Sequence, residues 1–349
     1  MENKKSIKPH RICFVAGKSG GHILPCITLA QHAINKHPNY EVMFFSTATI
    51  LDKQLVNGNA IIKHYIPLSL ESLPQKKILL YPRFIWHLIK AFFSSFNHLR
   101  KLKPEVVMST GGYIAIPVCI AARLLNIPIE LYEVNAIPGK AIKFLAPFAY
   151  KIWICFEHSI QFLPARKCAI TNYPIKFTEK NKVISQEQSL EKINFDPERK
   201  TILVLGGSQG SLFINAAMRR MLERNQAWQH KIQIIHQTGA GDTTDWNTLY
   251  SNLNIPSLVF SYSEKLGDYY AAADLVICRS GAGTLAEVSF FNKKCITIPL
   301  ETATTNHQVD NALAAAHMRP DLFRIVRQDE IEHNGNALFD SIAIGLQLI

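Results

Sequence analysis

Five glycine-rich stretches hold the residues of this chain best suited to chemistry. They are Gly17 to His22, Thr110 to Tyr113, Gly206 to Gly210, Thr238 to Asp242, and Arg279 to Thr284. Glycine between a strand and a helix lets the backbone approach a phosphate, and the helix that follows presents free N–H groups with a partial positive charge. A tight turn also needs glycine for steric reasons alone. Five such stretches in one chain favour a ligand that bears phosphate.

Two common nucleotide-binding motifs do not occur in the sequence. The dinucleotide fingerprint needs G-x-G-x-x-G and an acidic residue about twenty positions further on. The turn at Gly17 lacks the middle glycine, the turn at Gly206 has Ser208 in that place, and the strand expected at residues 42–46 ends without a carboxylate. The pattern G-x-x-x-x-G-K-[ST] is also absent, which argues against a P-loop nucleoside triphosphatase.

Glu287 is a candidate ligand for a ribose. It falls in the first turns of the helix expected after Arg279 to Thr284, where its carboxylate could accept hydrogen bonds from both ribose hydroxyls. The alternative is a solvated carboxylate that complements the helix dipole. No Asp-x-Asp occurs in the chain, so we expect no metal and no cofactor. Helix N-termini and basic side chains would meet the charge of a diphosphate.

The elements that must position these turns alternate between short β-rich runs and helical patterns, which is typical of βα units and a parallel sheet. Strands are expected at residues 12–16, 42–46, 61–66, 106–109, 127–132, 152–156, 201–205, 232–236, 257–260, 275–278 and 295–299. Each half begins with a strand, a glycine turn and a helix. The prediction is an α/β protein with two Rossmann-like parallel-sheet domains facing across a cleft, and a ligand at the carboxyl ends of the strands.

The length of 349 residues is consistent with two domains. Residues 171–200 are charged and carry two prolines without a sustained apolar period, so they are expected to hold the interdomain connection. We place the N-terminal domain at 1–175 and the C-terminal domain at 176–349. The seven cysteines form no CxxC pair and are expected to be small buried hydrophobes in a reducing cytosol.

Lys and Arg outnumber Asp and Glu by 38 to 27, which gives a formal charge of +11. Such a charge favours a polyanionic partner: nucleic acid, an anionic membrane or a phosphorylated substrate. The apolar run at residues 78–93 is interrupted by Arg83, His87 and Lys90, so we expect no membrane-spanning segment and no export signal.

Residues 75–103 hold seven Lys or Arg, six aromatic residues and no Asp or Glu. At helical spacing, one face is expected to pack in the core; it comprises Ile85, Leu88, Ile89, Phe92, Phe96 and Leu99. The other face is expected to meet anionic headgroups; it comprises Arg83, Trp86, His87, Lys90 and Lys101, with Phe93 at the rim. The alternative is a basic face that is simply solvated.

Six motifs occur in this order along the chain: Gly17-Lys-Ser-Gly-Gly-His-Ile-Leu-Pro25, Ser109-Thr-Gly-Gly-Tyr113, Glu133-Val-Asn-Ala-Ile-Pro-Gly139, Gly206-Gly-Ser-Gln-Gly210, Cys278-Arg-Ser-Gly-Ala-Gly-Thr-Leu-Ala-Glu287 and Asn306-His-Gln-Val-Asp-Asn-Ala312. Together they resemble the MurG family, the UDP-N-acetylglucosamine transferases that make lipid II for peptidoglycan. The resemblance runs from about residue 11 to about residue 315 and implies the GT-B fold, with an N-terminal acceptor domain, a C-terminal donor domain, and a last helix that could pack back on the N-terminal domain.

The implied reaction is an inverting transfer of GlcNAc from UDP-GlcNAc to the C4 hydroxyl of the MurNAc-pentapeptide-diphosphoryl-undecaprenol acceptor, lipid I. The implied partners are these two substrates and an anionic membrane surface, with other cell-wall synthesis proteins possible and no nucleic acid. The implied location is peripheral, on the cytoplasmic face of the inner membrane. A transferase for another lipid acceptor, and a membrane-bound assembly partner without strong catalysis, are the alternatives.

By position, the resemblance assigns site residues. Those for UDP-GlcNAc are Ser19, Gly20, Gly21, Asn135, Lys176, Ser208, Ser263, Ala282, Gly283, Thr284, Leu285, Ala286, Glu287 and Gln308, and Tyr113 is assigned to the acceptor. His22 is the leading candidate for the general base, and the alternative is that its imidazole caps the loop. Glu133 is the rival base, an orienting group for the acceptor, or a structural carboxylate. Arg279 could add charge at the leaving group or bond loop carbonyls.

The chain departs from the family pattern at several positions. Tyr132 and Val134 stand where the family has His and Gln, and Lys18 adds a cation. Lys176 stands where the family has an Arg that meets the diphosphate, and an ammonium group cannot make the bidentate contact of a guanidinium.

Overall fold

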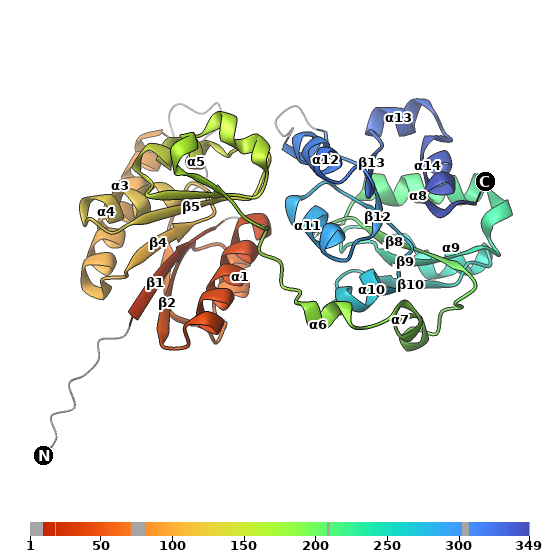
Figure 1. The fold of residues 1–349 in the computed structure, drawn as a ribbon, viewed down its shortest axis with the longest axis horizontal. Helices are drawn as coiled ribbons and strands as arrows, with labels where there is room; N and C mark the ends of the chain where they lie inside the picture. The colour runs from red at the N-terminus through yellow and green to blue at the C-terminus, as the bar shows by residue number, and fades with distance from the viewer. Residues whose placement is uncertain (1–9, 18, 71–80, 208–209, 302–306, 349) are drawn as a thin grey trace, which may run out of the picture. The chain divides into compact units, whose positions relative to one another are not determined.

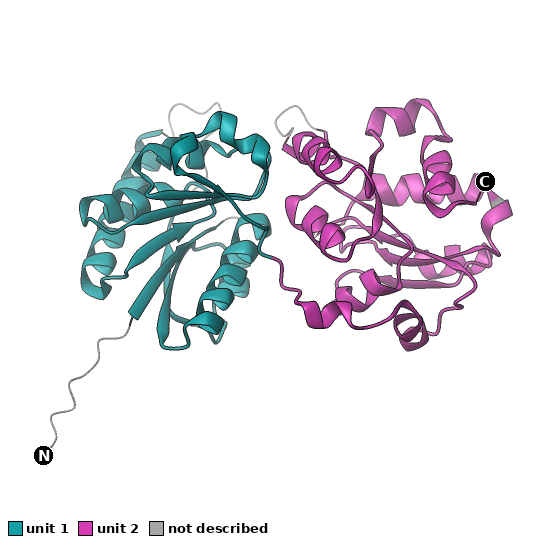
Figure 2. Cartoon of the chain, in the orientation of Figure 1, with its two compact units in different colours: residues 1–174 teal, residues 175–349 magenta. Residues whose placement is uncertain are grey.

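The structure is a computed structural model and describes residues 10–17, 19–70, 81–207, 210–301 and 307–348. The chain divides into two compact units, Met1–Pro174 and Ile175–Ile349 (Figure 2). Each unit has one parallel sheet with helices on both faces (Figure 1). The expected fold class, two Rossmann-like parallel-sheet units, is therefore confirmed.

The sheet of the first unit has seven strands in the order β3-β2-β1-β4-β5-β6-β7. Their bounds are β1 His10–Val15, β2 Tyr40–Thr47, β3 Ile62–Leu68, β4 Val106–Ser109, β5 Ile129–Glu133, β6 Lys151–Ile154 and β7 Cys168–Ile170. Its helices are α1 Gly20–Lys36, α2 Ile50–Val56, α3 Tyr81–Leu102, α4 Ala115–Leu124 and α5 Lys140–Leu145, with short 3₁₀ turns η2 Ala146–Phe148, η3 Glu157–Phe162 and η4 Ala165–Lys167.

Successive residues of the central strand β1 pack on opposite faces of this sheet, as the strand period requires. Phe14 belongs to a buried cluster with Ile23 of α1. Val15 belongs to a second cluster with Leu99 of α3. Because both faces are covered, the buried part of the strand, Ile12 to Val15, is a continuous apolar run rather than an alternating one, as in other parallel sheets.

The sheet of the second unit has six strands in the order β10-β9-β8-β11-β12-β13. Their bounds are β8 Lys200–Leu205, β9 Ile232–Gln237, β10 Ser257–Phe260, β11 Leu275–Cys278, β12 Lys294–Thr297 and β13 Phe323–Ile325. Its helices are α6 Glu179–Lys182, α7 Gln186–Lys192, α8 Leu212–Arg224, η5 Gln226–Trp228, α9 Trp246–Asn252, α10 Leu266–Ala272, α11 Ala282–Phe290, α12 His307–Met318, α13 Gln328–His333 and α14 Ala337–Leu346.

Two strands were not expected from the sequence. They are β7 and β13, each three residues long and each at one edge of its sheet. A three-residue run is too short to display the apolar pattern by which a strand is recognised. The other eleven strands lie where they were expected, with shifts of a few residues at some ends.

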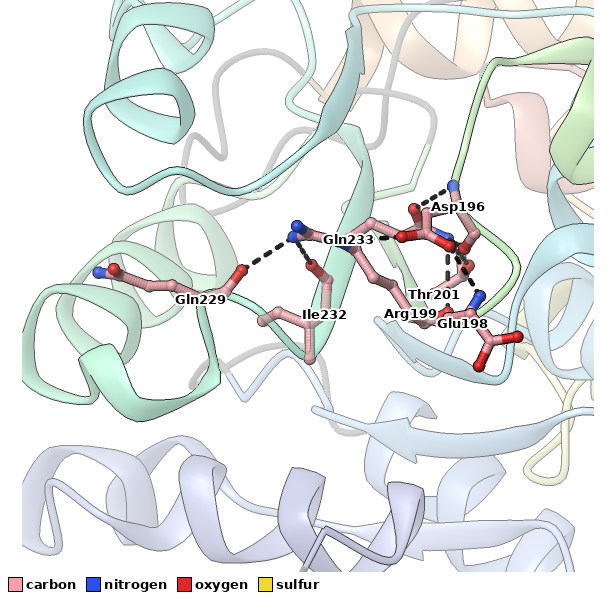
Figure 3. A network of polar contacts seen from close by, with 7 residues as sticks. All are labelled: Asp196, Glu198, Arg199, Thr201, Gln229, Ile232 and Gln233. Atoms are coloured by element: carbon pink, nitrogen blue, oxygen red, sulfur yellow. Dashed lines mark hydrogen bonds and ion pairs between the residues drawn. The ribbon is translucent and has the colours of Figure 1, made fainter.

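A buried glutamine anchors the segment that leads into β8 (Figure 3). Gln233 is fully buried; its Nε2 donates to the carbonyl of Asp196 at 2.8 Å and to Oγ1 of Thr201 at 2.9 Å, and its Oε1 accepts from the backbone N–H of Asp196 at 3.0 Å. Arg199 donates to the carbonyl of Gln229 at 3.1 Å. These bonds lie at the amino ends of the strands, whereas the glycine turns lie at their carboxyl ends.

The long helix α3 buries a different stripe from the one expected. Ile85 and Ile89, which were expected in the core, are 50% and 42% exposed, and they extend a surface that includes Trp86 and Phe93. Within α3, the buried residues are Phe84, Ala91, Ser95 and Leu99. The spacing gave the correct period but the wrong centre for the buried stripe, because several apolar residues lie on both sides of it.

The last helix, α14, packs against the core of the second unit. The buried residues Leu338 and Ile342 of α14 join the core of the second unit, and Gly345 lies against Leu275 of β11. Six of the seven cysteines are buried and Cys168 is partly buried, as expected. Within the described residues, no helix is both long enough and apolar enough to cross a membrane.

Candidate functional site

The loops after β1, β4 and β5 carry the predicted residues of the first unit. In the strand order, β1 and β4 are the neighbours at which the connections change direction along the sheet. Ligands of open α/β sheets bind outside the carboxyl ends of the strands at this point. The loop after β1 ends at Ser19, the exposed N-cap residue of α1, and Gly20 and Gly21 begin the helix. The N–H groups of a first helical turn lack partners within the helix and favour an anion.

His22 is bound to the loop after β4 through two hydrogen bonds. Its ring Nδ1 lies 2.9 Å from the carbonyl oxygen of Thr110, and the hydroxyl of Thr110 donates to the carbonyl of His22 at 2.8 Å. A carbonyl only accepts, so Nδ1 carries the proton and the basic lone pair of the neutral ring is on Nε2. The ring is half-buried. This tautomer is the one that a general base acting through Nε2 requires.

Two glycines allow the loops of the first unit to approach one another. Gly111 and Gly112 have φ angles of 98° and 83°, a conformation that favours glycine. A Cβ on Gly111 would lie 3.3 Å from Ile142 of α5 and 3.8 Å from the ring of His22. Tyr113, assigned to the acceptor, follows this turn directly and is half-buried.

Glu133 orders its own loop. The side chain is 2% exposed, and its two carboxylate oxygens accept from the backbone N–H groups of Asn135 at 2.8 Å and Gly139 at 2.9 Å. The side-chain amide of Asn135 also donates to it, at 3.2 Å. Burial raises the pKa of Glu133 to about 7 against the lowering effect of these bonds. The arrangement favours the structural alternative over the general base.

In the second unit, the equivalent point of the sheet lies between β8 and β11. The turn after β8 is tight: a Cβ on Gly206 would lie 2.3 Å from the backbone nitrogen of Ser211, and Gly207 and Gly210 have φ angles of 87° and 79°. The hydroxyl of Ser211 caps α8 by accepting from the N–H of Ile214 at 3.3 Å. Ser208, assigned to UDP-GlcNAc, lies outside the described residues, as does Lys18.

The turn after β11 leads into α11, whose N-cap Gly281 makes no side-chain cap bond. Gly283, Thr284 and Ala286 are half-buried. Ala282 and Leu285, also assigned to the donor, are 7% and 2% exposed. The N–H of Leu285 donates to Gly281. Because the side chain of Leu285 is buried, it is not accessible to a ligand. The accessible groups of this turn belong to Gly283, Thr284 and Ala286.

Glu287 is held by Tyr270, which was not singled out from the sequence. The fully buried Tyr270 hydroxyl donates to Oε2 of Glu287 at 2.9 Å. Burial raises the pKa of Glu287 to about 7, while this bond and the charge of nearby Lys176 act to lower it. Lys176 is exposed and lies over the ring of Phe177, with its ammonium 5.3 Å from the ring centre. The charge of Lys176 thus acts on the carboxylate of Glu287.

Gln308 and Ser263 both use their side chains within the protein. Gln308 Oε1 accepts from the N–H of Leu300 at 2.9 Å. The Ser263 hydroxyl donates to the hydroxyl of Tyr269 at 3.3 Å and accepts from the N–H of Lys265 at 3.0 Å. Both side chains are thus engaged within the second unit.

Arg279 bonds to other parts of its own unit. Its guanidinium donates to the hydroxyl of Ser211 at 3.0 Å, to the carbonyls of Ile298 and Pro299 at 3.2 and 3.1 Å, and to Gln328 at 2.6 Å. The side chain is buried. This set favours the structural alternative, in which Arg279 ties the ends of three loops together. Across the described residues, no group of three or more His, Cys, Asp or Glu could hold a metal ion.

Comparison with known proteins agrees with this architecture. Residues 12–154 match the glycosyltransferase family 28 N-terminal domain, and residues 201–334 match the family's C-terminal domain. The UDP-N-acetylglucosamine–N-acetylmuramyl-(pentapeptide) pyrophosphoryl-undecaprenol N-acetylglucosamine transferase of Thermodesulfovibrio yellowstonii is 34% identical over 304 residues, which cover 86% of this chain and 81% of that protein. The transferase of the same name from Myxococcus xanthus is 33% identical, over 87% of this chain and 77% of its own length.

Among solved structures, the MurG of Acinetobacter baumannii superposes with a TM-score of 0.72 at 24% identity, over 96% of this chain and 91% of that one. Two Rossmann-like units with glycine turns at the carboxyl ends of their sheets, together with both family 28 domains, make the chain a glycosyltransferase of the GT-B class. Within that class, the chain belongs to the MurG family of glycosyltransferase family 28.

Proposed function

We propose that this protein transfers GlcNAc from UDP-GlcNAc to the C4 hydroxyl of lipid I, the MurNAc-pentapeptide-diphosphoryl-undecaprenol, to form lipid II. The observation that carries the proposal is the pairing of glycine turns with helix N-termini at the same point of both sheets, in a chain of the MurG family. Such turns suit a diphosphate donor without a dinucleotide fingerprint.

In the proposed reaction, Nε2 of His22 takes the proton of the acceptor hydroxyl while that oxygen attacks the anomeric carbon of GlcNAc. The bond from this carbon to the diphosphate oxygen breaks, and UDP leaves with the electron pair, so the configuration inverts. The Nδ1–H bond to Thr110 keeps Nε2 basic and prevents the ring from turning. Positioning a base in this way typically contributes about 10²–10⁴-fold to a rate.

In the second unit, we assign the negative charge of the leaving UDP to the first turns of α8 and α11, where N–H groups without helical partners carry partial positive charge. Glu287 accepts hydrogen bonds from the ribose, oriented by Tyr270. Lys176 adds a cation next to this carboxylate. We assign Glu133 and Arg279 to the support of their loops, through the bonds that each makes there.

We also propose that α3 attaches the protein to an anionic membrane. Trp86 and Phe93 are 56% and 59% exposed, and the exposed Arg83 and Lys90 lie on the same helix. Apolar side chains next to cations suit insertion at the level of the headgroups, with the cations held by anionic lipid. Ile85 and Ile89 enlarge the apolar part of this face beyond what the sequence pattern indicated.

The test is to measure UDP release from UDP-GlcNAc by the purified protein with and without lipid I. The expected result is release only when lipid I is present, unaffected by EDTA. Lipid I that fails to elicit release, when another undecaprenyl-linked acceptor does elicit it, would assign the protein to a different acceptor. Activity that EDTA abolishes and magnesium restores would contradict the proposed donor site.

A further inference from the structure

A buried chain of hydrogen bonds lies next to the turn that begins α8, and the proposed reaction does not use it. It joins Tyr250 of α9, His236 of β9, Asn215 of α8 and Asp242 in the loop after β9. Tyr250 and His236 are fully buried and Asn215 is 1% exposed. Buried polar groups of this kind are costly unless each is satisfied, so the direction of every bond carries information.

The bonds run in one direction through the chain. The side-chain oxygen of Asn215 lies 3.1 Å from Nε2 of His236, and Nδ1 of His236 lies 2.8 Å from the hydroxyl of Tyr250. The amide nitrogen of Asn215 donates to the carbonyl of Thr238 at 3.0 Å and to Oδ2 of Asp242 at 2.6 Å. Because that nitrogen is the donor, the Asn215 oxygen must accept, so Nε2 of His236 carries a proton and Tyr250 donates to Nδ1.

The charges along the chain are consistent with this direction. Burial lowers the pKa of His236 to about 4, although the carboxylate of Asp242 acts to raise it, so the imidazole is neutral near pH 7. Burial acts to raise the pKa of Asp242, but bonds from Thr244, Asn215 and Trp246 outweigh it and bring the pKa to about 2. Asn215 lies between the neutral ring of His236 and the ionised carboxylate of Asp242. Its side-chain amide therefore has one orientation, with the nitrogen toward Asp242 and the oxygen toward His236.

Asn215 holds the carbonyl on which the glycine turn rests. A Cβ added to Gly210 would lie 2.4 Å from the carbonyl oxygen of Thr238 and 2.6 Å from Cα of Gly239. That same carbonyl oxygen accepts from the Asn215 amide. Gly210 also donates its N–H to Gly207 at 3.0 Å, which closes the turn. Gly210 is thus packed against a carbonyl oxygen that the Asn215 amide holds by a hydrogen bond.

We propose that Asn215, oriented by His236, is a positioning residue for the sugar-nucleotide donor: it holds the Thr238 carbonyl against Gly210 and so keeps Gly210 and the first turn of α8 in place for the diphosphate. The inference rests on the proposed function, because it requires this turn to bind UDP. Without Asn215, the Thr238 carbonyl loses the side-chain donor that holds it against Gly210.

The test compares Asn215→Ala with Gln233→Ala in the full-length protein, with UDP as the probe. Both side chains are buried, and each is the centre of a polar network on or beside β9, but that of Gln233 lies at the opposite edge of the sheet (Figure 3). Thermal melts first identify a temperature at which both variants are folded. UDP affinity is then measured by calorimetry at that temperature. Steady-state kinetics then give KM for UDP-GlcNAc and kcat.

Asn215→Ala is expected to weaken UDP binding about tenfold, the size of one net hydrogen bond, and to raise KM for UDP-GlcNAc more than it lowers kcat. Gln233→Ala is expected to lose thermal stability but to bind UDP within about twofold of wild type. A folded Asn215→Ala protein with wild-type UDP affinity would overturn the inference. An equal loss of affinity in both variants would also overturn it, because the loss would then follow stability alone.

If Asn215→Ala does not fold, Asp242→Asn tests the positioning role of Asn215 instead. Asp242 is only half-buried, and the change keeps its shape. Its carboxylate accepts from Thr244 on one oxygen and from Asn215 and Trp246 on the other, so an amide satisfies only one side. Loss of a negative charge would by itself strengthen the binding of an anionic ligand. Weaker UDP binding by this variant therefore supports the positioning role of Asn215. Unchanged or stronger UDP binding opposes that role. A wild-type protein that does not bind UDP at all would instead refute the proposed function.

Discussion

At the scale of single residues, the tautomer of His22 is the feature closest to the proposed chemistry. His22→Ala is expected to lower the rate of lipid I-dependent UDP release by about 10²–10⁴-fold, because a base acts in the transition state, while UDP-GlcNAc affinity changes little. Thr110→Val is the control, since it removes the bond to the His22 carbonyl and keeps the imidazole. If His22→Ala lost donor affinity as severely as rate, the imidazole would be a loop anchor rather than the base.

Glu287 is the residue expected to distinguish a ribose from a deoxyribose. Glu287→Gln keeps the shape of the side chain but removes its charge and one acceptor, so UDP affinity is expected to fall by about tenfold. The preference for UDP over 2′-deoxy-UDP should shrink as well. Calorimetry with both nucleotides measures the two effects. An undiminished preference in the variant would exclude contact between Glu287 and the 2′ hydroxyl.

The raised pKa of Glu287 also predicts a dependence of stability on pH. Burial holds this pKa at about 7 in the folded protein, above the ordinary value of 4.5. Between these values the unfolded chain releases the proton while the folded protein keeps it, so the free energy of unfolding falls as pH rises from about 4.5 to about 7. Glu287→Gln removes this loss. The Tm of the variant minus the Tm of the wild type should therefore be larger at pH 8 than at pH 5. The same difference at both pH values would contradict a raised pKa of Glu287.

At the scale of elements, α3 is the helix whose surface bears most directly on location in the cell. Arg83, Lys90 and Lys101 changed together to Glu should abolish binding to vesicles of anionic lipid at low salt, because each cation near such a surface contributes about 1 kcal/mol. A matched control reverses three exposed cations of the second unit, at Lys180, Arg220 and Lys231. Co-sedimentation measures both. Equal loss in both variants would show attraction by net charge, without a particular face.

At the scale of the whole molecule, each unit has its own apolar core, and the cores share no residues. The segment after Pro174 belongs to the second unit, where Phe177 is 8% exposed and packs edge-to-face on Phe291 with ring centres 5.0 Å apart. We therefore expect residues 175–349 expressed alone to unfold cooperatively on heating. The fragment should bind UDP within about tenfold of the full chain and transfer no sugar. A fragment that is unfolded would show that the units depend on each other for stability.

Much of this architecture follows from the sequence. The eleven strands expected from apolar runs are present, because strands that are buried on both faces are mostly apolar. The glycine turns lie at the carboxyl ends of β1, β4, β8, β9 and β11, since the order of strand, turn and helix is local along the chain. The motifs within those turns were also sufficient to indicate the MurG family, which the relatives confirm.

Tertiary structure decided what depends on residues that are distant in the sequence. The partners of Arg279, the stripe of α3 that is buried and the place of α14 follow from how elements pack, and no spacing encodes them. The same is true of Asn215 and His236, which are 21 positions apart and meet because α8 crosses the end of β9. The sequence by itself determined which loops reach the ligand edge of each sheet. Only the packed structure determined which side chains hold those loops in place, because a buried polar group takes whichever partner the fold brings within hydrogen-bond distance.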